Sequence, residues 1–282
     1  GGYGIRCDVG EPASVEAATA VGLSSASTTL GFFSDPACTV AITSVTIPEG
    51  QSGAGFYFKD TTVGLPGISL AATGFTSGAQ AQNIIAAAPS KLVVVTPPRT
   101  VVAGLCSAVL TFQAQDTYGN PAPVAAQTPV TFSSTSTGET FFTDASCGTA
   151  SSTANIPAAG NAVSIYFEDT SAGSPTVTAA AAGFLNGTQV ETVTAAAPAG
   201  LAFTSAPQTV TAGACSSATV VQAQDAFGNP SPVPSGISIA LSSLPATVTF
   251  YSMVGCVGAV NSLSMGTGTS DQTFYFIGRA SG

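Results

Sequence analysis

Apolar and polar side chains alternate along short stretches of this chain, and no stretch shows the periodicity of an amphipathic helix. In residues 108–115, Leu110, Phe112 and Ala114 would face one side of an extended strand, while the side chains between them would face the other. The same reasoning predicts strands at residues 92–96, 108–115, 130–134, 140–143, 163–168, 176–182 and 188–195. About seven short strands separated by turns predict an all-β, immunoglobulin-like β-sandwich.

The chain repeats itself at a constant interval, which relates Cys38, Cys147 and Cys256. A longer motif, Gln-Ala-Gln-Asp-x-(Tyr/Phe)-Gly-Asn-Pro, occupies residues 113–121 and recurs at residues 222–230. A fixed period of this kind indicates repeated structural units. The sequence therefore predicts three tandem immunoglobulin-like repeats, at residues 1–88, 89–197 and 198–282.

The second repeat is the one that covers a whole period. Residues that lie one repeat period apart are said here to have the same phase. Gly1 has the phase of Leu110 and Gly282 has the phase of Gly173, so we expect the first repeat to lack its opening strands and the third its closing strands. We also expect the chain to come from a longer array. Residues 86–92 and 195–201 join successive repeats through a few residues that include proline, which makes a short, semi-rigid connection. The expected shape is an elongated rod.

Each repeat contains two cysteines, and their equal spacing in the two later repeats predicts one disulfide in each. The predicted pairs are Cys106 with Cys147 and Cys215 with Cys256. In the first repeat Cys7 has the phase of Asp116 instead of Cys106, and we still expect it to pair with Cys38. Metal binding is the alternative, but the chain has no His and no Cys-x-x-Cys. Disulfides persist outside the cytosol, so we expect an extracellular protein.

Charged side chains make up 7% of the chain and the net charge is −9, with five scattered basic residues. Nucleic acid is not an expected partner, because phosphate binding needs a basic face. The apolar runs have the length of strands, so we expect no direct membrane insertion. Without His, a phosphate-binding Gly-x-x-x-x-Gly-Lys or a dinucleotide fingerprint, we expect no cofactor and no enzymatic activity.

Asp116 and Asp225 begin the repeated Asp-x-x-Gly-Asn-Pro turn and allow two interpretations. In the first, each carboxylate caps its own turn by accepting backbone N–H groups. In the second, each is a Ca²⁺ ligand at a junction between repeats, joined by Asn120 or Asn229, and such a site would need about six or more oxygen ligands. The adjacent carboxylates of Glu168 and Asp169 are interpreted as a solvated strand end.

Residues 101–104 (Val-Val-Ala-Gly), residues 113–121 and residues 130–132 (Val-Thr-Phe) form a pattern that recurs at 210–213, 222–230 and 239–241. This pattern resembles the bacterial immunoglobulin-like repeats of invasin- and intimin-type surface proteins. The resemblance implies a tandem sandwich that serves as the stalk of a bacterial cell-surface adhesin or fibre.

The leading hypothesis is therefore a structural rod whose partners are neighbouring repeats of the same or identical chains. One alternative is a subunit that polymerises into a filament through unpaired edge strands. Another is a binding module whose inter-strand loops hold a host or surface glycan or protein. Light scattering on the isolated chain separates the filament from the other two, because a strict monomer at high concentration excludes it.

Overall fold

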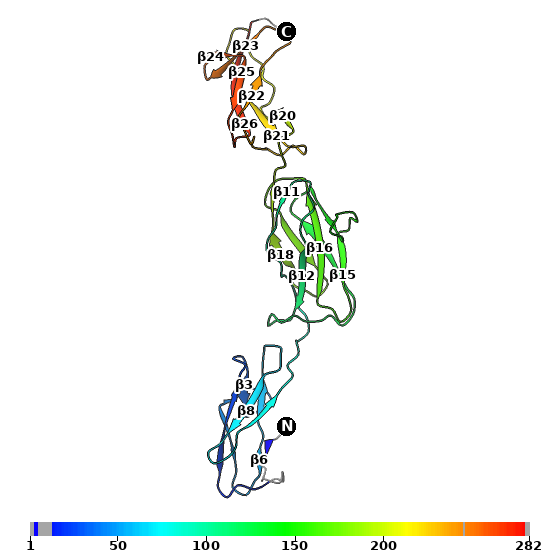
Figure 1. Cartoon of the computed structure of the whole chain (residues 1–282), viewed down its shortest axis with the longest axis vertical. Helices are drawn as coiled ribbons and strands as arrows, with labels where there is room; N and C mark the ends of the chain where they lie inside the picture. The colour runs from blue at the N-terminus through cyan, green and yellow to red at the C-terminus, as the bar shows by residue number, and fades with distance from the viewer. Residues whose placement is uncertain (1–2, 5–12, 245, 280–282) are drawn as a thin grey trace.

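The computed structural model describes residues 3–4, 13–244 and 246–279, which form strands and loops. Figure 1 shows three bodies in a row along one long axis, joined by narrow connections. Among the described residues there is no helix long and apolar enough to cross a bilayer. The molecule is an all-β chain of tandem sandwiches, as the sequence predicted. We call the parts formed by β1–β9, β10–β19 and β20–β26 the first, second and third units.

The second unit consists of two four-stranded antiparallel sheets. The first sheet has the order β10 (Lys91–Val94), β12 (Leu110–Gln115), β16 (Ala162–Asp169) and β14 (Glu139–Phe142). The second sheet has the order β15 (Thr153–Ile156), β13 (Thr128–Ser134), β17 (Thr176–Ala180) and β18 (Gly187–Val190). A separate parallel pair joins β11 (Thr100–Val102) to β19 (Thr192–Thr194).

Three features of this unit differ from the predicted strands. β11 and β15 were not predicted, because each is short; β15 buries one side chain fully, Ile156, and so shows little alternation. The predicted strand at 188–195 is two strands, β18 and β19, which pair with different partners. Glu191 lies between them with a buried side chain that accepts a hydrogen bond from the backbone N–H of Arg99. At this contact the chain leaves the sheet that contains β18 and enters the parallel pair of β11 and β19.

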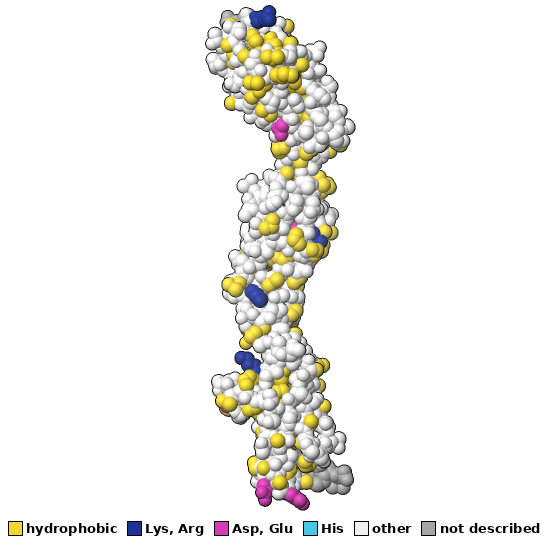
Figure 2. Space-filling view, turned by 90° about the vertical axis from the view of Figure 1, so that its left-hand side faces the viewer, with side chains coloured by type: hydrophobic (Ala, Val, Ile, Leu, Met, Phe, Trp, Pro, Cys, Tyr) yellow, Lys and Arg dark blue, Asp and Glu magenta, His cyan; other side chains and the backbone are white. Residues whose placement is uncertain are grey.

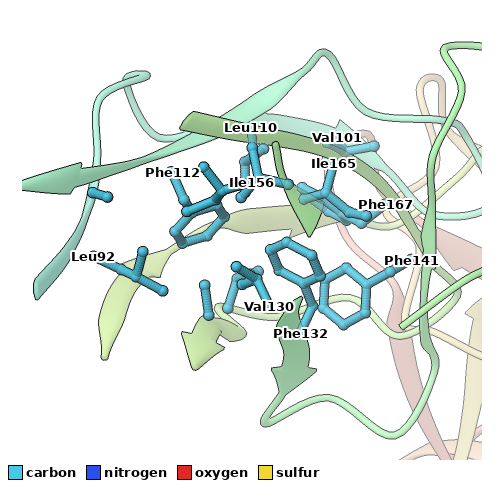
Figure 3. Close-up of a cluster of buried hydrophobic side chains, with 14 of the residues drawn as sticks. Leu92, Val101, Leu110, Phe112, Val130, Phe132, Phe141, Ile156, Ile165 and Phe167 are labelled. Carbon is cyan, nitrogen blue, oxygen red and sulfur yellow. The ribbon is translucent and has the colours of Figure 1, made fainter. Parts of the chain in front are cut away.

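Alternating side chains of the two sheets form the core of the second unit. Along β12, Leu110, Phe112 and Ala114 are fully buried, as the pattern predicted. Figure 3 shows the rings of Phe112, Phe132 and Phe141 side by side, with centroid distances of 5.5 Å and 5.9 Å between neighbours. Buried aromatic pairs of this kind contribute about 0.5–1.5 kcal/mol each beyond their buried area.

The first unit has the same layout with fewer residues at its start. One sheet has the order β5 (Ser44–Ile47), β2 (Thr19–Ser25), β8 (Gly67–Ala71) and β9 (Gly78–Ala81). A second sheet has the order β4 (Ala41–Ile42), β3 (Gly31–Phe33) and β7 (Tyr57–Lys59). A two-stranded pair consists of β1 (Tyr3–Gly4) and β6 (Gly53–Ala54).

The third unit has one five-stranded sheet and one strand pair. The sheet has the order β20 (Gly200–Phe203), β21 (Thr219–Gln224), β26 (Asp271–Gly278), β23 (Val248–Met253) and β24 (Val257–Val260). The pair consists of β22 (Ile237–Ala240) and β25 (Ser262–Met265). Its core residues, such as Met265 and Phe274, belong to a cluster of their own.

Disulfides join Cys106 to Cys147 and Cys215 to Cys256, with Cα–Cα distances of 5.8 Å and 5.7 Å. Both fall inside a single unit, in agreement with the equal spacing of the two cysteine pairs in the sequence. Cys7 lies outside the described residues, and Cys38 forms no disulfide with a described cysteine. The pairing of Cys7 with Cys38 therefore stays a prediction.

Candidate functional site

The Asp-x-x-Gly-Asn-Pro turn of the second unit is organised around the carboxylate of Asp116. This side chain is fully buried, and its Oδ1 accepts hydrogen bonds from the backbone N–H groups of Tyr118 and Asn120, both at 2.9 Å. Gly119 has φ of 93°, a conformation that glycine adopts without strain. The turn is therefore fixed by its own acidic residue, as the capping interpretation predicted.

The same turn forms the joint between the first and second units. The side-chain amide of Asn120 donates to the backbone carbonyl of Thr61 at 2.9 Å and accepts from the backbone N–H of Val63 at 3.2 Å. It also donates to Asp116 Oδ2 at 2.8 Å, and that oxygen accepts from the backbone N–H of Ala87 at 3.0 Å. Two side chains thus bind two separate backbone segments of the preceding unit.

The second joint repeats these contacts one sequence period further along the chain. The amide of Asn229 donates to the carbonyl of Thr170 at 2.8 Å and accepts from the N–H of Ala172 at 2.8 Å. It also donates to Asp225 Oδ2, which accepts from the N–H of Ala196 at 2.9 Å. Each contact has its counterpart in the first joint, so the joint is a repeated structural element. We call this set of contacts the joint clamp.

Electrostatics favour the ionised form of both clamp aspartates. Burial raises the pKa of Asp116, but the hydrogen bonds from Asn120, Ala87 and Tyr118 together outweigh it and hold the pKa below its ordinary value. The pKa of Asp225 is lowered by the same balance of burial against donated hydrogen bonds. The carboxylates therefore act as charged acceptors, and bonds to ionised acceptors are roughly twice as strong as neutral ones.

The geometry of Asp116 and Asp225 favours capping over calcium binding. Both oxygens of each carboxylate face N–H donors, whose hydrogen atoms occupy the directions that a cation would need. The carbonyl oxygens of Asn120 and Asn229 likewise accept backbone N–H groups. In the part of the chain that the structure describes, no group of three or more acidic or cysteine side chains is arranged to hold a metal ion.

The loops that receive the clamp are themselves held by aspartates, Asp169, which is fully buried, and Asp60, which is half-buried. Asp169 Oδ1 accepts from the backbone N–H of Ser171 at 2.8 Å and from the hydroxyl of Ser136 at 3.0 Å. Asp60, at the same phase, accepts from the backbone N–H of Thr62 at 3.0 Å. The interpretation of Asp169 as part of a solvated strand end is wrong, because its side chain is fully buried. It turns inward to shape the loop on which the next unit docks.

Asp169 also belongs to an acidic cluster inside the second unit. Glu139 lies opposite Asp169 in the register of β14 and β16, and the hydroxyl of Ser134 donates to Glu139 Oε2 at 2.5 Å. Burial, together with the charges of Asp169 and Glu191, raises the pKa of Glu139 to about 7, despite the hydrogen bond from Ser134. Glu139 Oε1 and Asp169 Oδ2 are buried, with no hydrogen-bond partner among the described residues.

The second joint has two further contacts. The ring of Phe227 lies directly against Gly104, where an added Cβ atom would overlap the ring. Because Gly104 belongs to the second unit and Phe227 to the third, this contact adds an apolar element to the joint. The hydroxyl of Ser231 donates to the carbonyl of Ala196 at 2.6 Å. At the phase of Ser231 the first joint has Ala122, which carries no such donor.

Sequence reasoning identified the clamp residues and the capping role of the aspartates, but not the contacts of the asparagines with the preceding unit. Asp116 and Asp225 were singled out, and Asn120 and Asn229 were named as their companions in a possible calcium site. The structure brings each Asp–Asn pair together and directs the Asn side chain at the backbone of the preceding unit. The available signal was the recurrence of Asn before Pro, close in sequence to a junction between repeats.

No family model matches this chain, and no curated protein matches it. Among solved structures it is similar to invasin, described as a bacterial integrin-binding protein, with 16% identity over 99% of this chain and 50% of that chain and a TM-score of 0.36. Domains 1–6 of the surface layer protein SbsC are 15% identical over 85% of this chain and 29% of theirs, with a TM-score of 0.29.

A β-glycosidase from Bacteroides vulgatus is 12% identical over 65% of this chain, with a TM-score of 0.33. The chain spans 23% of the length of that enzyme and half of the length of the invasin chain. At these identities and TM-scores the similarities support no conclusion about function.

Proposed function

We propose that this chain is a non-enzymatic rod segment of an extracellular surface adhesin or fibre of a bacterium, in which tandem sandwiches set length and stiffness. The observation that carries the proposal is the joint clamp, which occurs with the same contacts at both joints. A flexible array of independent domains would not need a buried Asp and a directed Asn at each junction. Repeating them restricts the angle between successive units.

The strength of the clamp is consistent with a stiff joint. In each joint the Asn amide donates one hydrogen bond to a backbone carbonyl of the preceding unit and accepts one from a backbone N–H of that unit. A further backbone N–H of the preceding unit donates to the Asp carboxylate. Net contributions of about 1 kcal/mol for a neutral bond and about 1.5–3 kcal/mol for a bond to a charge give about 3–5 kcal/mol per joint as an upper value. Thermal energy is about 0.6 kcal/mol, so bending that breaks the clamp is rarely populated.

The surface and the disulfides fit an extracellular position. Figure 2 shows that Lys, Arg, Asp and Glu side chains are few on the face in view, most of which is covered by uncharged groups. Such a surface depends little on ion pairs, whose strength changes with salt. The two disulfides would persist in an oxidising compartment. The resemblance to invasin- and intimin-type repeats also supports the bacterial cell surface as location.

Small-angle X-ray scattering on the chain with Asn120→Ala and Asn229→Ala tests the proposal. We expect the maximum dimension of the unaltered chain to match a straight rod and the double variant to show a broader distribution of shorter distances. Asn261→Ala is the matched control, because Asn261 is exposed and its backbone carbonyl pairs with the N–H of Leu241 inside the third unit, not with a joint residue. A double variant with the scattering curve of the unaltered chain, while still folded by circular dichroism, would count against the proposal.

A further inference from the structure

Two acidic side chains of the second unit lie next to each other at the ends of two paired strands. Glu139 is the first residue of β14 and lies opposite Asp169, the last residue of β16. Side chains of directly opposed residues in an antiparallel pair point to the same face, with Cβ atoms about 4.5–5.5 Å apart. Asp169 is fully buried and Glu139 is half-buried, so the two carboxyl groups are neighbours on the inner face of the sheet.

Each of these carboxyl groups has one oxygen that binds a hydrogen-bond donor and one that does not. Glu139 Oε2 accepts from the hydroxyl of Ser134. Asp169 Oδ1 accepts from the hydroxyl of Ser136 and from the backbone N–H of Ser171. Glu139 Oε1 and Asp169 Oδ2 are buried and have no hydrogen-bond partner among the described residues. Two buried, unpartnered carboxylate oxygens are costly, whereas one proton held between them gives both a partner.

The charged side chains around the pair also favour a bound proton. Burial is the main cause that raises the pKa of Glu139, and the charges of Asp169 and of the fully buried Glu191 add to it. Arg99 donates its backbone N–H to Glu191, but its guanidinium donates to a backbone carbonyl at 2.7 Å. Glu168 precedes Asp169 in β16, so its side chain points to the opposite face of the sheet.

The acidic pair is attached directly to the loop on which the third unit docks. Thr170 follows Asp169 in the chain, and its backbone N–H donates to the carbonyl of Gly138 at 3.3 Å, just before Glu139. The carbonyl of Thr170 in turn accepts from the side-chain amide of Asn229 at 2.8 Å in the second joint. Repulsion that separates the start of β14 from the end of β16 therefore displaces a residue that the joint clamp holds.

The first joint has the same clamp without the acidic pair. Leu30 has the phase of Glu139 and packs against the core of the first unit. Asp60 has the phase of Asp169 and is half-buried. The first unit thus has one carboxyl group where the second unit has two, and its joint serves as an internal comparison.

We propose that Glu139 and Asp169 share one proton, and that the loss of this proton to water loosens the second joint and leaves the first joint unchanged. In the protonated state the O–H of Glu139 donates to Asp169 Oδ2, so both buried oxygens are satisfied and the pair carries one negative charge. In the deprotonated state two negative charges repel each other across β14 and β16. This inference rests on the proposed rod function, because it concerns the stiffness of a joint.

The direction of the pH dependence follows from proton linkage. Burial and the neighbouring acids raise the pKa of Glu139 from 4.5 to about 7 while the pair is closed. Moving the two carboxyl groups apart lowers that pKa toward its ordinary value. The closed state therefore binds the proton more tightly, so a closed joint is favoured below about pH 7 and is weakened as the pH rises through that value.

NMR of the Asn229 side-chain amide in the full chain, at pH 5.5 and at pH 8.5, tests the proposal. We expect the order parameter of this amide to fall by at least about 0.2 at the higher pH, which is most of the difference between rigid and flexible groups. The amide of Asn120, which makes the equivalent contacts in the first joint, should keep the same order parameter at both pH values. The ¹³C shift of Glu139 Cδ should titrate with a midpoint of about 7.

Variants at two positions separate the shared proton from a general effect of pH. Glu139→Gln is neutral at both pH values and can donate to Asp169 Oδ2, so Asn229 should stay ordered at pH 8.5. Glu139→Leu copies the first unit and should also abolish the pH response. Glu168→Gln is the matched control, because Glu168 adjoins Asp169 but points to the opposite face, and this variant should keep the response.

Two results would overturn the proposal and leave the joint clamp standing. One is a Glu139 carboxyl group that titrates near its ordinary pKa, and the other is an Asn229 amide that is equally ordered at both pH values. A different result would remove the proposed rod function as well. If the amides of Asn120 and Asn229 were both flexible at pH 5.5, neither joint would be clamped, and the proposal would fail together with that function.

Discussion

Replacing Asn229 by Asp exchanges the side-chain NH₂ group at the centre of the second joint for an oxygen atom and should break the clamp. The Nδ2 atom of Asn229 donates to Thr170 O and to Asp225 Oδ2, both at 2.8 Å. Asn229→Asp puts an oxygen in place of that donor with almost no change of shape. The new oxygen would face a carbonyl oxygen and a buried carboxylate, and neither can donate a hydrogen atom to it.

The cost follows from the lost bonds and the new repulsion. Losing one neutral hydrogen bond costs about 1 kcal/mol, and losing one to a charged acceptor costs about 1.5–3 kcal/mol. Two negative charges about 4 Å apart repel by about 4 kcal/mol at an effective dielectric constant of about 20. Relaxation of the loop reduces this total. We expect Asn229→Asp to lower the free energy of unfolding of the third unit by about 3–5 kcal/mol at pH 7.

The loss should depend on pH with a definite sign. The carboxylate of Asp225 raises the folded-state pKa of the introduced carboxyl above its unfolded value, so the destabilisation is full above the folded pKa. It shrinks as the pH falls toward the unfolded pKa of about 4, because a protonated carboxyl can donate to Asp225. Asn229→Ala, which introduces no charge, should lose less at pH 7 and show no such recovery.

Urea unfolding of the third unit measures these free energies of unfolding. The protein is equilibrated with urea at pH 7 or at pH 4.5, and a hydrogen-exchange pulse at one fixed pH then reports the unfolded fraction. Peptides that cover residues 219–230 report on the clamp directly. An Asn229→Asp variant as stable as the unaltered chain at pH 7, or one whose deficit is the same at both pH values, would refute the assigned geometry.

Two further predictions concern the interior of the second unit. Burial raises the pKa of Glu139 to about 7, so the charged form destabilises the fold above that pH. Glu139→Gln should therefore raise the free energy of unfolding by about 1–2 kcal/mol at pH 8, after allowance for partial exposure, and leave it unchanged below pH 4.5. Thermal melts at the two pH values check this, and equal gains at both would contradict it. Replacing both Cys106 and Cys147 by Ser should cost about 4 kcal/mol, because the disulfide closes a long loop. Melting of the unaltered chain with and without reductant should show the same loss, and an unchanged melting temperature would be the contrary result.

The sequence predicted the strands whose alternation is strong and missed those whose alternation is weak. β12 follows the predicted pattern residue by residue, since every second side chain enters the core. β11 and β15 are three and four residues long, and their existence depends on pairing with distant partners, β19 and β13. The alternation of apolar and polar residues does not reveal pairing with a distant strand when a strand buries one or two side chains.

The joint clamp shows a different limit. The Asp-x-x-Gly-Asn-Pro motif was sufficient to predict a capped turn, because the contacts of Asp116 with Tyr118 and Asn120 are local. The bonds from Asn120 to Thr61 and Val63 join residues far apart in the sequence and depend on how two folded units meet. Asp169 was misjudged for the same reason, since its buried carboxylate contacts Ser136, which is distant in the sequence.

Residual dipolar couplings measured separately for the second and third units in the full chain test most directly whether the clamp fixes the joint. A rigid joint predicts that both units share one alignment tensor, with the same magnitude and rhombicity, and that Asn229→Ala makes the magnitudes diverge. Two clearly different alignment magnitudes in the unaltered chain would contradict the account, because they would mean that the units reorient independently.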